Sequence, residues 1–292
     1  MNNKIIKNKY GFFELKNKPT KQELEKYYTK KYFQSDKEYK NKYEKFEKEY
    51  ITNKISQKYS IIKKLITNKK RLSLLEIGSG EGWTLNFFYN KNWQVTGLDF
   101  SNSSCQNHNP KLLSKFITGD PQKNLIKIIE QKNKYDVIWL DNVLEHVLEP
   151  PKLLEQIKEV STPKTILVIE VPNDFSYLQS YLFKNKYINK KHWVAYPDHI
   201  SYFNQKGLNK LCQKTGWLNK YTISDWPIEL DLLNPQTNYI KNPKVGKYSH
   251  QTRIKKENIL HQISPTKTIE LFKILADMNL GRQITSFFKL YK

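Results

Sequence analysis

Cysteine and arginine are scarce in this chain of 292 residues. The two cysteines, Cys105 and Cys212, cannot build a disulfide framework, which favours a reducing compartment. Only Arg71, Arg253 and Arg282 are arginine among the 50 basic residues, and all the others are lysine. Because bidentate phosphate recognition and readout of base edges favour arginine, the composition argues against a specific nucleic-acid-binding protein.

Long apolar runs are missing as well. No stretch approaches the length of a membrane span, and no apolar segment follows Met1 as it would in a signal peptide. We therefore expect a cytoplasmic protein without a membrane span. The net charge is +22, with lysines spread along the chain, which indicates a compositional bias and a solvated lysine surface. Weak attraction to polyanions or acidic substrates stays open.

One glycine-rich stretch organises what is present. Residues 74–77 have the pattern of a short buried parallel strand, and residues 78–82, Gly-Ser-Gly-Glu-Gly, lead into a helix expected at 84–89. Glycine lets the backbone bend sharply and approach a ligand, and N–H groups at a helix start favour an anionic group. A second strand, residues 94–98, ends at Asp99, whose carboxylate suits a ribose diol.

The spacing of these glycines separates two cofactor classes. A pyrophosphate-binding loop reads G-x-G-x-x-G, and its third glycine packs the helix on the strand. Here Trp83 takes that position, and the extra glycine, Gly82, comes one residue earlier. Glu76 precedes the loop, where its carboxylate could receive an ammonium group. The pattern E-x-G-x-G-x-G, followed by Asp at the next strand end, resembles class I S-adenosylmethionine-dependent methyltransferases rather than a strand–turn–helix with incidental glycines.

This resemblance implies a fold, a cofactor and a set of binding residues. The fold is α/β, a doubly wound, Rossmann-like sheet of seven mostly parallel strands. The cofactor is S-adenosylmethionine, with S-adenosylhomocysteine (SAH) as product, and we expect no NAD binding. The residues expected to bind the cofactor are Glu76, Gly78, Ser79, Gly80, Gly82, Trp83, Asp99, Phe100, Asp120 and Asp141.

Acidic residues follow the third and fourth expected strands. Residues 116–118 predict the third strand, after which Asp120 resembles the family residue that accepts from the adenine amino group. The alternative is that Asp120 caps the turn beginning at Pro121. Residues 135–140 predict the fourth strand, which ends at Asp141 and continues into a helix.

The segment after Asp141 resembles the small-molecule branch, near the ubiquinone-biosynthesis O-methyltransferases. Some members of that branch hold a divalent cation through two Glu and the His of E-x-x-E-H. Here Glu145 and His146 match, but Asn142 replaces the first Glu, so we expect no metal. His146 either lines the substrate site or packs. The N/D-P-P-Y/F/W motif of nucleic-acid amino methyltransferases does not occur at this position.

A second unusual segment follows the fifth expected strand. Residues 192–203 contain two His, one Asp and four aromatic residues. Because ligands of a doubly wound sheet lie outside the carboxyl ends of its strands, this segment should roof the pocket. His199 is the candidate catalytic base, and His192 and Tyr196 are candidate substrate contacts; alternatively these side chains only pack. The P-D-H-I-S-Y-F element resembles methyltransferases from bacterial capsule and lipopolysaccharide gene clusters.

The rest of the chain predicts a cap and two insertions. Residues 1–66 predict a helical N-terminal cap, and residues 67–292 predict the methyltransferase domain. Insertions are expected at about 175–203 and 227–280. The second insertion is expected to form a helical lid beside the substrate pocket, where it sets specificity or forms a dimer contact. A last strand should pair antiparallel with the sixth, and a homodimer is one open option.

Two features of the cap are specific. Thr20 and Glu23 have the spacing of a capping box, which predicts a helix start. Tyr28, Tyr32 or Gln34 closes over the cofactor, or these side chains belong to helices that pack on the core.

The expected function is methyl transfer from S-adenosylmethionine to a hydroxyl or amine of a small molecule. The resemblance implies a sugar, nucleotide-sugar or phosphorylated precursor in surface-polysaccharide biosynthesis. Alternatives are a quinone or phenol O-methyltransferase and a non-catalytic, cofactor-binding partner subunit. Because the sulfonium donor is already activated, the protein must align the reacting groups and take a proton from a hydroxyl acceptor, a task that suits histidine with its ordinary pKa of ~6.5.

Overall fold

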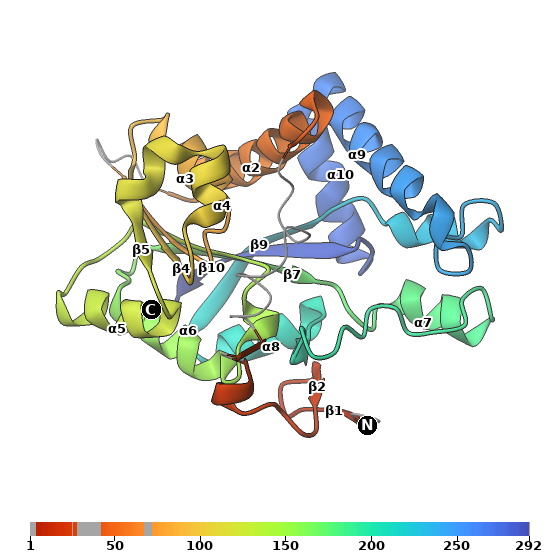
Figure 1. The fold of residues 1–292 in the computed structure, drawn as a ribbon, viewed down its shortest axis with the longest axis horizontal. Coiled ribbons are helices and arrows are strands. Elements are labelled where there is room, and N and C mark those ends of the chain that lie inside the picture. The colour runs from red at the N-terminus through yellow and green to blue at the C-terminus, as the bar shows by residue number, and fades with distance from the viewer. Residues whose placement is uncertain (1–3, 25, 28–41, 67–71, 292) are drawn as a thin grey trace.

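A seven-stranded sheet forms the centre of the computed structural model, which describes residues 4–24, 26–27, 42–66 and 72–291. The strand order is β5-β4-β3-β6-β7-β10-β9 (Figure 1). The first five strands are parallel, and β10 runs antiparallel between β7 and β9. This is the predicted doubly wound α/β fold. The strands are β3 (Ser73–Ile77), β4 (Gln94–Asp99), β5 (Phe116–Thr118), β6 (Val137–Asp141), β7 (Ile166–Pro172), β9 (Trp217–Ser224) and β10 (Gln283–Leu290).

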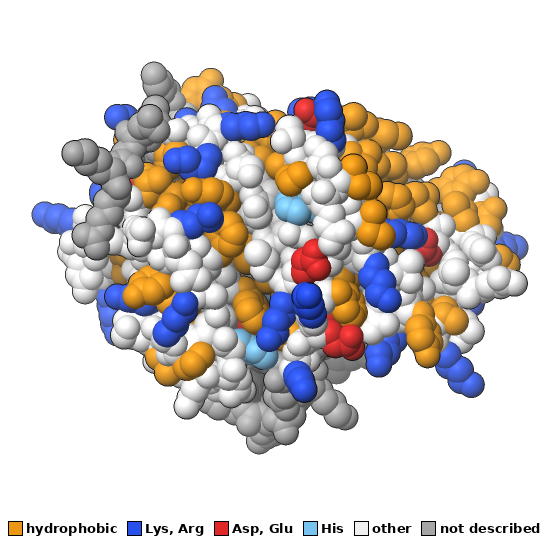
Figure 2. Space-filling model, turned by 90° about the horizontal axis from the view of Figure 1, so that it is seen from above, with side chains coloured by type: hydrophobic (Ala, Val, Ile, Leu, Met, Phe, Trp, Pro, Cys, Tyr) orange, Lys and Arg blue, Asp and Glu red, His pale blue; other side chains and the backbone are white. Residues whose placement is uncertain are grey.

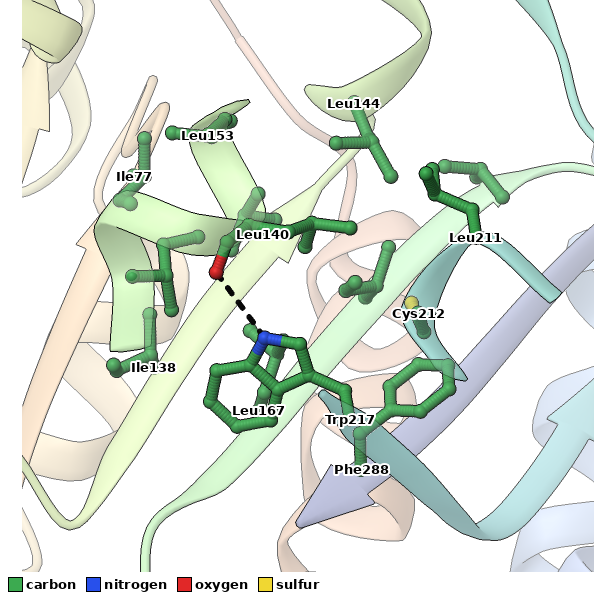
Figure 3. Packing of buried hydrophobic residues seen from close by; sticks show 14 of the residues in the cluster. Ile77, Ile138, Leu140, Leu144, Leu153, Leu167, Leu211, Cys212, Trp217 and Phe288 are labelled. Atoms are coloured by element: carbon green, nitrogen blue, oxygen red, sulfur yellow. Dashed lines mark hydrogen bonds between the residues drawn. The ribbon is translucent and has the colours of Figure 1, made fainter. Parts of the chain in front are cut away.

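Helices cover both faces of this sheet, so its strands read as continuous apolar runs. Successive residues point to opposite faces: Ile138 and Leu140 join one core cluster, while Val137 and Trp139 join the other. Figure 3 shows the first cluster, in which the Trp217 indole N–H donates to the carbonyl oxygen of Leu154 at 3.2 Å.

Two groups of helices supply the outer layers. The first cluster is completed by α5 (Pro121–Glu130), α6 (Pro150–Glu159) and α8 (Gln205–Lys214). The second is completed by α2 (Lys45–Leu65), α3 (Trp83–Tyr89), α4 (Ser103–His108) and α10 (Pro265–Asp277). Gly216 follows α8 with φ +87°, a conformation that glycine adopts without strain, so the chain turns there into β9.

The N-terminal region contains a small sheet in addition to helices. Strands β1 (Ile5–Lys7), β2 (Phe13–Leu15) and β8 (Ser201–Tyr202) pair antiparallel. The predicted capping box at Thr20 and Glu23 is confirmed, since the Glu23 backbone N–H donates to the Thr20 hydroxyl and the Thr20 N–H donates to the Glu23 carboxylate. Tyr28, Tyr32 and Gln34 lie outside the described residues.

The segment predicted as the second insertion consists of the short helices η3 (Ile228–Leu233) and η4 (Pro243–Val245), followed by α9 (Gly246–Ile263) and α10. The expected helix break near Pro265 is confirmed, because the Ser264 hydroxyl caps α10 by accepting from the Lys267 N–H. Helix α9 contacts α2, and α10 packs on β9.

The helix expected after Asp141 is wrong. Only a single 3₁₀ turn, η2 (Leu144–His146), forms there. Asn142 has φ +52°, which interrupts a right-handed helix immediately after the strand. As a result His146 lies on a tight turn rather than on a helix face.

Many cationic side chains lie on the face of the molecule that is at the top in Figure 1. Figure 2 shows Lys and Arg side chains dispersed over this face, with few Asp and Glu among them. This distribution agrees with a solvated lysine surface. Among the described helices, none is both long enough and apolar enough to cross a membrane.

Candidate active site

A cavity of about 570 Å³ lies at the carboxyl ends of β3, β4 and β6, the edge at which doubly wound sheets bind ligands. Its volume lies in the usual range for small-molecule and cofactor sites. The sequence-predicted residues on its wall are Gly78, Gly80, Trp83, Asp99, Phe100, Asp120, Asp141 and His146. Glu76, Ser79 and Gly82 are buried beneath or beside this wall.

The glycine loop needs its glycines for close packing. Gly78 has φ +77°, and a Cβ atom there would come within 2.5 Å of Cγ2 of Val143. Gly80, with φ +49°, donates its backbone N–H to Oδ2 of Asp99 at 2.8 Å. Asp99 therefore ties the loop to the end of β4 as well as facing the cavity.

Three carboxyl groups converge below and around the loop. Glu76 is buried, and its Oε2 atom has no hydrogen-bond partner among the described residues. Burial raises the pKa of Glu76 well above its ordinary value, and the nearby Asp141 and Asp99 raise it further. Burial also raises the pKa of Asp99, and the hydrogen bond from the Gly80 N–H, which lowers this pKa, offsets only part of the increase. This concentration of acid groups favours a ligand that brings positive charge into the cavity.

Asp120 caps helix α5 and also lines the cavity. Its Oδ1 accepts from the backbone N–H groups of Gln122 at 2.9 Å and Lys123 at 3.2 Å, so the capping alternative is confirmed. Its Oδ2 lies 3.5 Å from Nζ of Lys21, and both residues line the cavity. A contact between Asp120 and adenine stays a prediction.

Asp141 is held from behind by a buried lysine of α2. Lys58 is 2% exposed, and its Nζ lies 3.0 Å from Oδ2 of Asp141 and 2.7 Å from Oε2 of Glu170. Burial alone would raise the pKa of Glu170, but Lys54 and Lys58 outweigh it and hold that pKa well below its ordinary value. Neither lysine was predicted from the sequence, in which the i, i+4 spacing of Lys54 and Lys58 on this helix was the available signal.

Tyr43 and Glu81, which were not predicted as site residues, lie beside the predicted Trp83. The hydroxyl of Tyr43 donates to the Glu81 carboxylate, at 2.9 Å from Oε1 and 2.8 Å from Oε2. The Trp83 indole N–H donates to the same carboxylate at 2.5 Å. Tyr43, Glu81 and Trp83 all line the cavity, so a residue just before α2 closes one side of the site.

Two histidines meet at another wall of the cavity. His146 lines it, and its Nδ1 lies 2.7 Å from the backbone oxygen of Asp198. Because a carbonyl oxygen only accepts, Nδ1 carries the proton, and the lone pair of the neutral ring is on Nε2. His199 is not among the described residues that line the cavity; its ring packs edge-on against His146, with centroids 5.0 Å apart.

A buried carboxyl completes this group. Glu145 is 1% exposed, its Oε1 lies 3.9 Å from Nε2 of His146, and burial raises its pKa well above the ordinary value. Glu145, His146 and His199 each bring one ligand atom within 4.8 Å of the others. These residues could hold a cation, so the expectation of no metal stays a prediction.

The other two expected substrate contacts lie elsewhere. His192 is not among the described residues on the cavity wall; it packs beside Trp193 and Tyr239, and burial lowers its pKa to about 4. Tyr196 is 54% exposed and is likewise not on the described wall. The expected roof instead turns away from the cavity, because Ser201 and Tyr202 pair with β2. The segment contacts the site at His146, through the backbone oxygen of Asp198 and the ring of His199.

Comparisons with known proteins agree with this geometry. Residues 45–220, more than half of the chain, match the family model described as a methyltransferase domain. Comparison with curated protein sequences gives no match.

Similar solved structures include an S-adenosylmethionine (SAM)-dependent methyltransferase from Archaeoglobus fulgidus (14% identity, 91% of this chain, 99% of that chain, TM-score 0.50). Another is a putative sarcosine dimethylglycine methyltransferase from Galdieria sulphuraria (16% identity, 82% of this chain, 85% of that chain, TM-score 0.49). A third is the plantazolicin methyltransferase BpumL in complex with SAH (16% identity, 94% of this chain, 91% of that chain, TM-score 0.48). The chain thus belongs to the methyltransferase domain family, and its fold is that of the class I SAM-dependent methyltransferases.

Proposed function

We propose that this methyltransferase acts on a hydroxyl, or an amine, of a small molecule that enters the same cavity as the cofactor. The observation that carries the proposal is the placement of His146 on the wall of a cavity of about 570 Å³ that is also lined by Gly78, Gly80 and Asp99. A concavity of this size suits a cofactor and a small acceptor. A macromolecular acceptor would instead need an extended docking surface around the opening.

The residues at the loop fit S-adenosylmethionine. The orphaned, buried carboxyl oxygen of Glu76 is suited to the ammonium group, and the acidic surroundings favour a cationic ligand. Asp99 is suited to the ribose hydroxyls and the outer oxygen of Asp120 to the adenine amino group. When bound, the cofactor supplies an activated methyl group on a sulfonium.

His146 is the group best placed to accept the acceptor's proton. Its Nδ1–H is fixed on the carbonyl of Asp198, which leaves Nε2 as the basic nitrogen. As the acceptor oxygen is methylated, its proton passes to Nε2, and the imidazolium then releases it to water. His199, the base expected from the sequence, supports the ring of His146 from behind and acts as a positioning residue.

The acceptor class is proposed from the resemblance to capsule and lipopolysaccharide methyltransferases. It comprises sugars, nucleotide-linked sugars and phosphorylated precursors of surface polysaccharides. A phenol or quinol is a second candidate, because the apolar side chains of Val143 and Val147 lie on the cavity wall with His146 and would pack against an aromatic ring.

The acceptor class can be tested with methyl-labelled cofactor. Nucleotide sugars, sugar phosphates and simple phenols are incubated with the enzyme, and label in each product is measured. We expect transfer to one of the hydroxylated sugar compounds. Transfer only to phenols would support the second candidate, and transfer only to protein or nucleic acid would contradict the proposal.

The base can be tested by comparing two matched variants. His146→Ala should keep cofactor affinity and lower single-turnover methyl transfer to a hydroxyl by ~10²–10⁴-fold, the usual contribution of a general base. His199→Ala should have a smaller effect. Melting temperatures control for folding. A near-normal rate in His146→Ala with a collapsed rate in His199→Ala would return the role to His199.

A further inference from the structure

Two neighbouring segments carry exposed lysines and tyrosines and contain no acidic residue, although the chain has 28 acidic residues. The first covers residues 175–197 and includes α7 (Tyr177–Lys184); the second covers residues 232–256 and includes η4 and the first half of α9. Figure 1 shows α7 and the loop leading into α9 at the same end of the molecule. Acid-free segments of this length create a local positive field.

Hydrogen bonds and a shared core hold the two segments together. Nζ of Lys241 donates to the backbone oxygen of Lys186 at 3.0 Å, and the Asn238 amide donates to the backbone oxygen of Tyr187 at 2.9 Å. Beneath them, Leu182 and Leu232 belong to one buried apolar cluster. The positive charges of the two segments therefore sum on a single rim.

The outer face of α7 is aromatic rather than polar. Leu178 and Leu182 point into the core, whereas Tyr177 is 72%, Tyr181 41% and Phe183 40% exposed. A surface helix ordinarily turns polar side chains to the solvent. Exposed aromatic side chains, above all tyrosines with an apolar ring and a polar tip, are suited to the boundary between water and an apolar phase.

Lysines surround these aromatic side chains. The exposed members are Lys184, Lys186, Lys190, Lys191, Lys241, Lys244 and Lys247, together with the exposed Tyr248. Ammonium groups act as point charges, and anionic lipid headgroups attract such clusters by summed charge. Because the cations in this set are all lysine, with none of the forked guanidinium groups that read phosphates individually, a lipid surface fits better than a specific nucleic acid.

We propose that this tyrosine–lysine rim, Tyr177, Tyr181, Phe183, Tyr248 and the seven lysines named above, docks the enzyme on membranes that contain anionic lipid. The aromatic side chains enter the boundary between headgroups and acyl chains, and the lysines face the headgroups. Helix α7 follows the carboxyl end of β7, the edge of the sheet that also holds the cavity. The proposal is independent of the acceptor and of the base.

Vesicle co-sedimentation tests this surface with the full-length protein. Vesicles contain phosphatidylcholine with or without phosphatidylglycerol. Lys184→Gln/Lys186→Gln/Lys190→Gln/Lys191→Gln should lower the partition coefficient on anionic vesicles by ~10-fold or more, since each lysine near the surface contributes. Tyr177→Ser/Tyr181→Ser should lower it by ~5-fold. The matched control neutralises four exposed lysines elsewhere, at Lys127, Lys132, Lys206 and Lys210, and should bind nearly as wild type.

The outcomes are distinct. Binding to anionic but not neutral vesicles, lost with both rim variants and kept by the matched control, supports the proposal. Equal loss in the matched control would show that only net charge matters, and no vesicle binding, or binding of single-stranded RNA alone, would overturn it. Melting temperature and cofactor affinity should stay unchanged in every variant, because none of the substituted residues lines the cavity.

Discussion

Asp99 connects the backbone of the glycine loop to the cavity. Its carboxylate accepts from the Gly80 N–H at 2.8 Å and from the Ser101 N–H at 3.3 Å, and the residue is only 8% exposed. The sequence predicted a ligand contact for this residue, but its support of the loop follows only from the three-dimensional arrangement. Both roles make Asp99 sensitive to truncation.

Asp99→Ala should weaken cofactor binding by ~1–3 kcal/mol, the usual cost of leaving buried hydrogen-bond partners unpaired. Titration calorimetry with S-adenosylmethionine measures this change, and Asp277→Ala, an exposed acid on α10, serves as control. Unchanged affinity in Asp99→Ala would show that the ligand does not depend on this loop.

The pKa of His192 should make the stability of the folded protein depend on pH. Burial lowers its folded-state pKa to about 4 from 6.5, and the unfolded chain therefore binds the proton more readily than the native state. The contribution of His192 to native stability is complete above pH 6.5 and is lost as the pH falls towards 4. His192→Phe should flatten this part of the curve of melting temperature against pH. An identical slope in the variant and the wild type would mean that other groups cause the acid loss.

At the scale of elements, local patterns predicted the strands better than the connections. The buried runs at β3, β6 and β7 stand out because both faces of the sheet are covered. The expected helix after Asp141 failed, because the left-handed backbone of Asn142 is a property of the folded turn. The pairing of β8 with β2 joins segments far apart in the chain, which no local pattern encodes.

Helix α2 is connected to the site by charge as well as by packing. Lys58→Met should destabilise the protein by about 3 kcal/mol, because it leaves the buried Glu170 with less compensation and Asp141 without its lysine. Lys64→Met, an exposed position on the same helix, should be nearly neutral. Urea unfolding measures both. A Lys58→Met protein as stable as the control would show that the buried pair adds no net stability.

For the whole molecule, the sequence predicted the fold class and part of the cavity wall. Strand ends converge on one edge of a parallel sheet, so residues such as Gly78, Asp99 and Asp141 could be placed together from their positions alone. That His146 rather than His199 lines the wall could not be predicted, since it depends on how the segment before β8 packs. Tyr43, which reaches Glu81 from the N-terminal region, was equally outside the reach of local patterns.

Methyl transfer to a small acceptor within the cavity is the step on which the proposed function depends. The most direct test incubates wild-type enzyme and Asp99→Ala with methyl-labelled cofactor and a cell extract, then separates small metabolites from protein and nucleic acid. We expect label in the small-metabolite fraction with wild type and a strong decrease with Asp99→Ala at limiting cofactor. Label confined to protein or nucleic acid, or equal labelling by the variant, would contradict the proposed function.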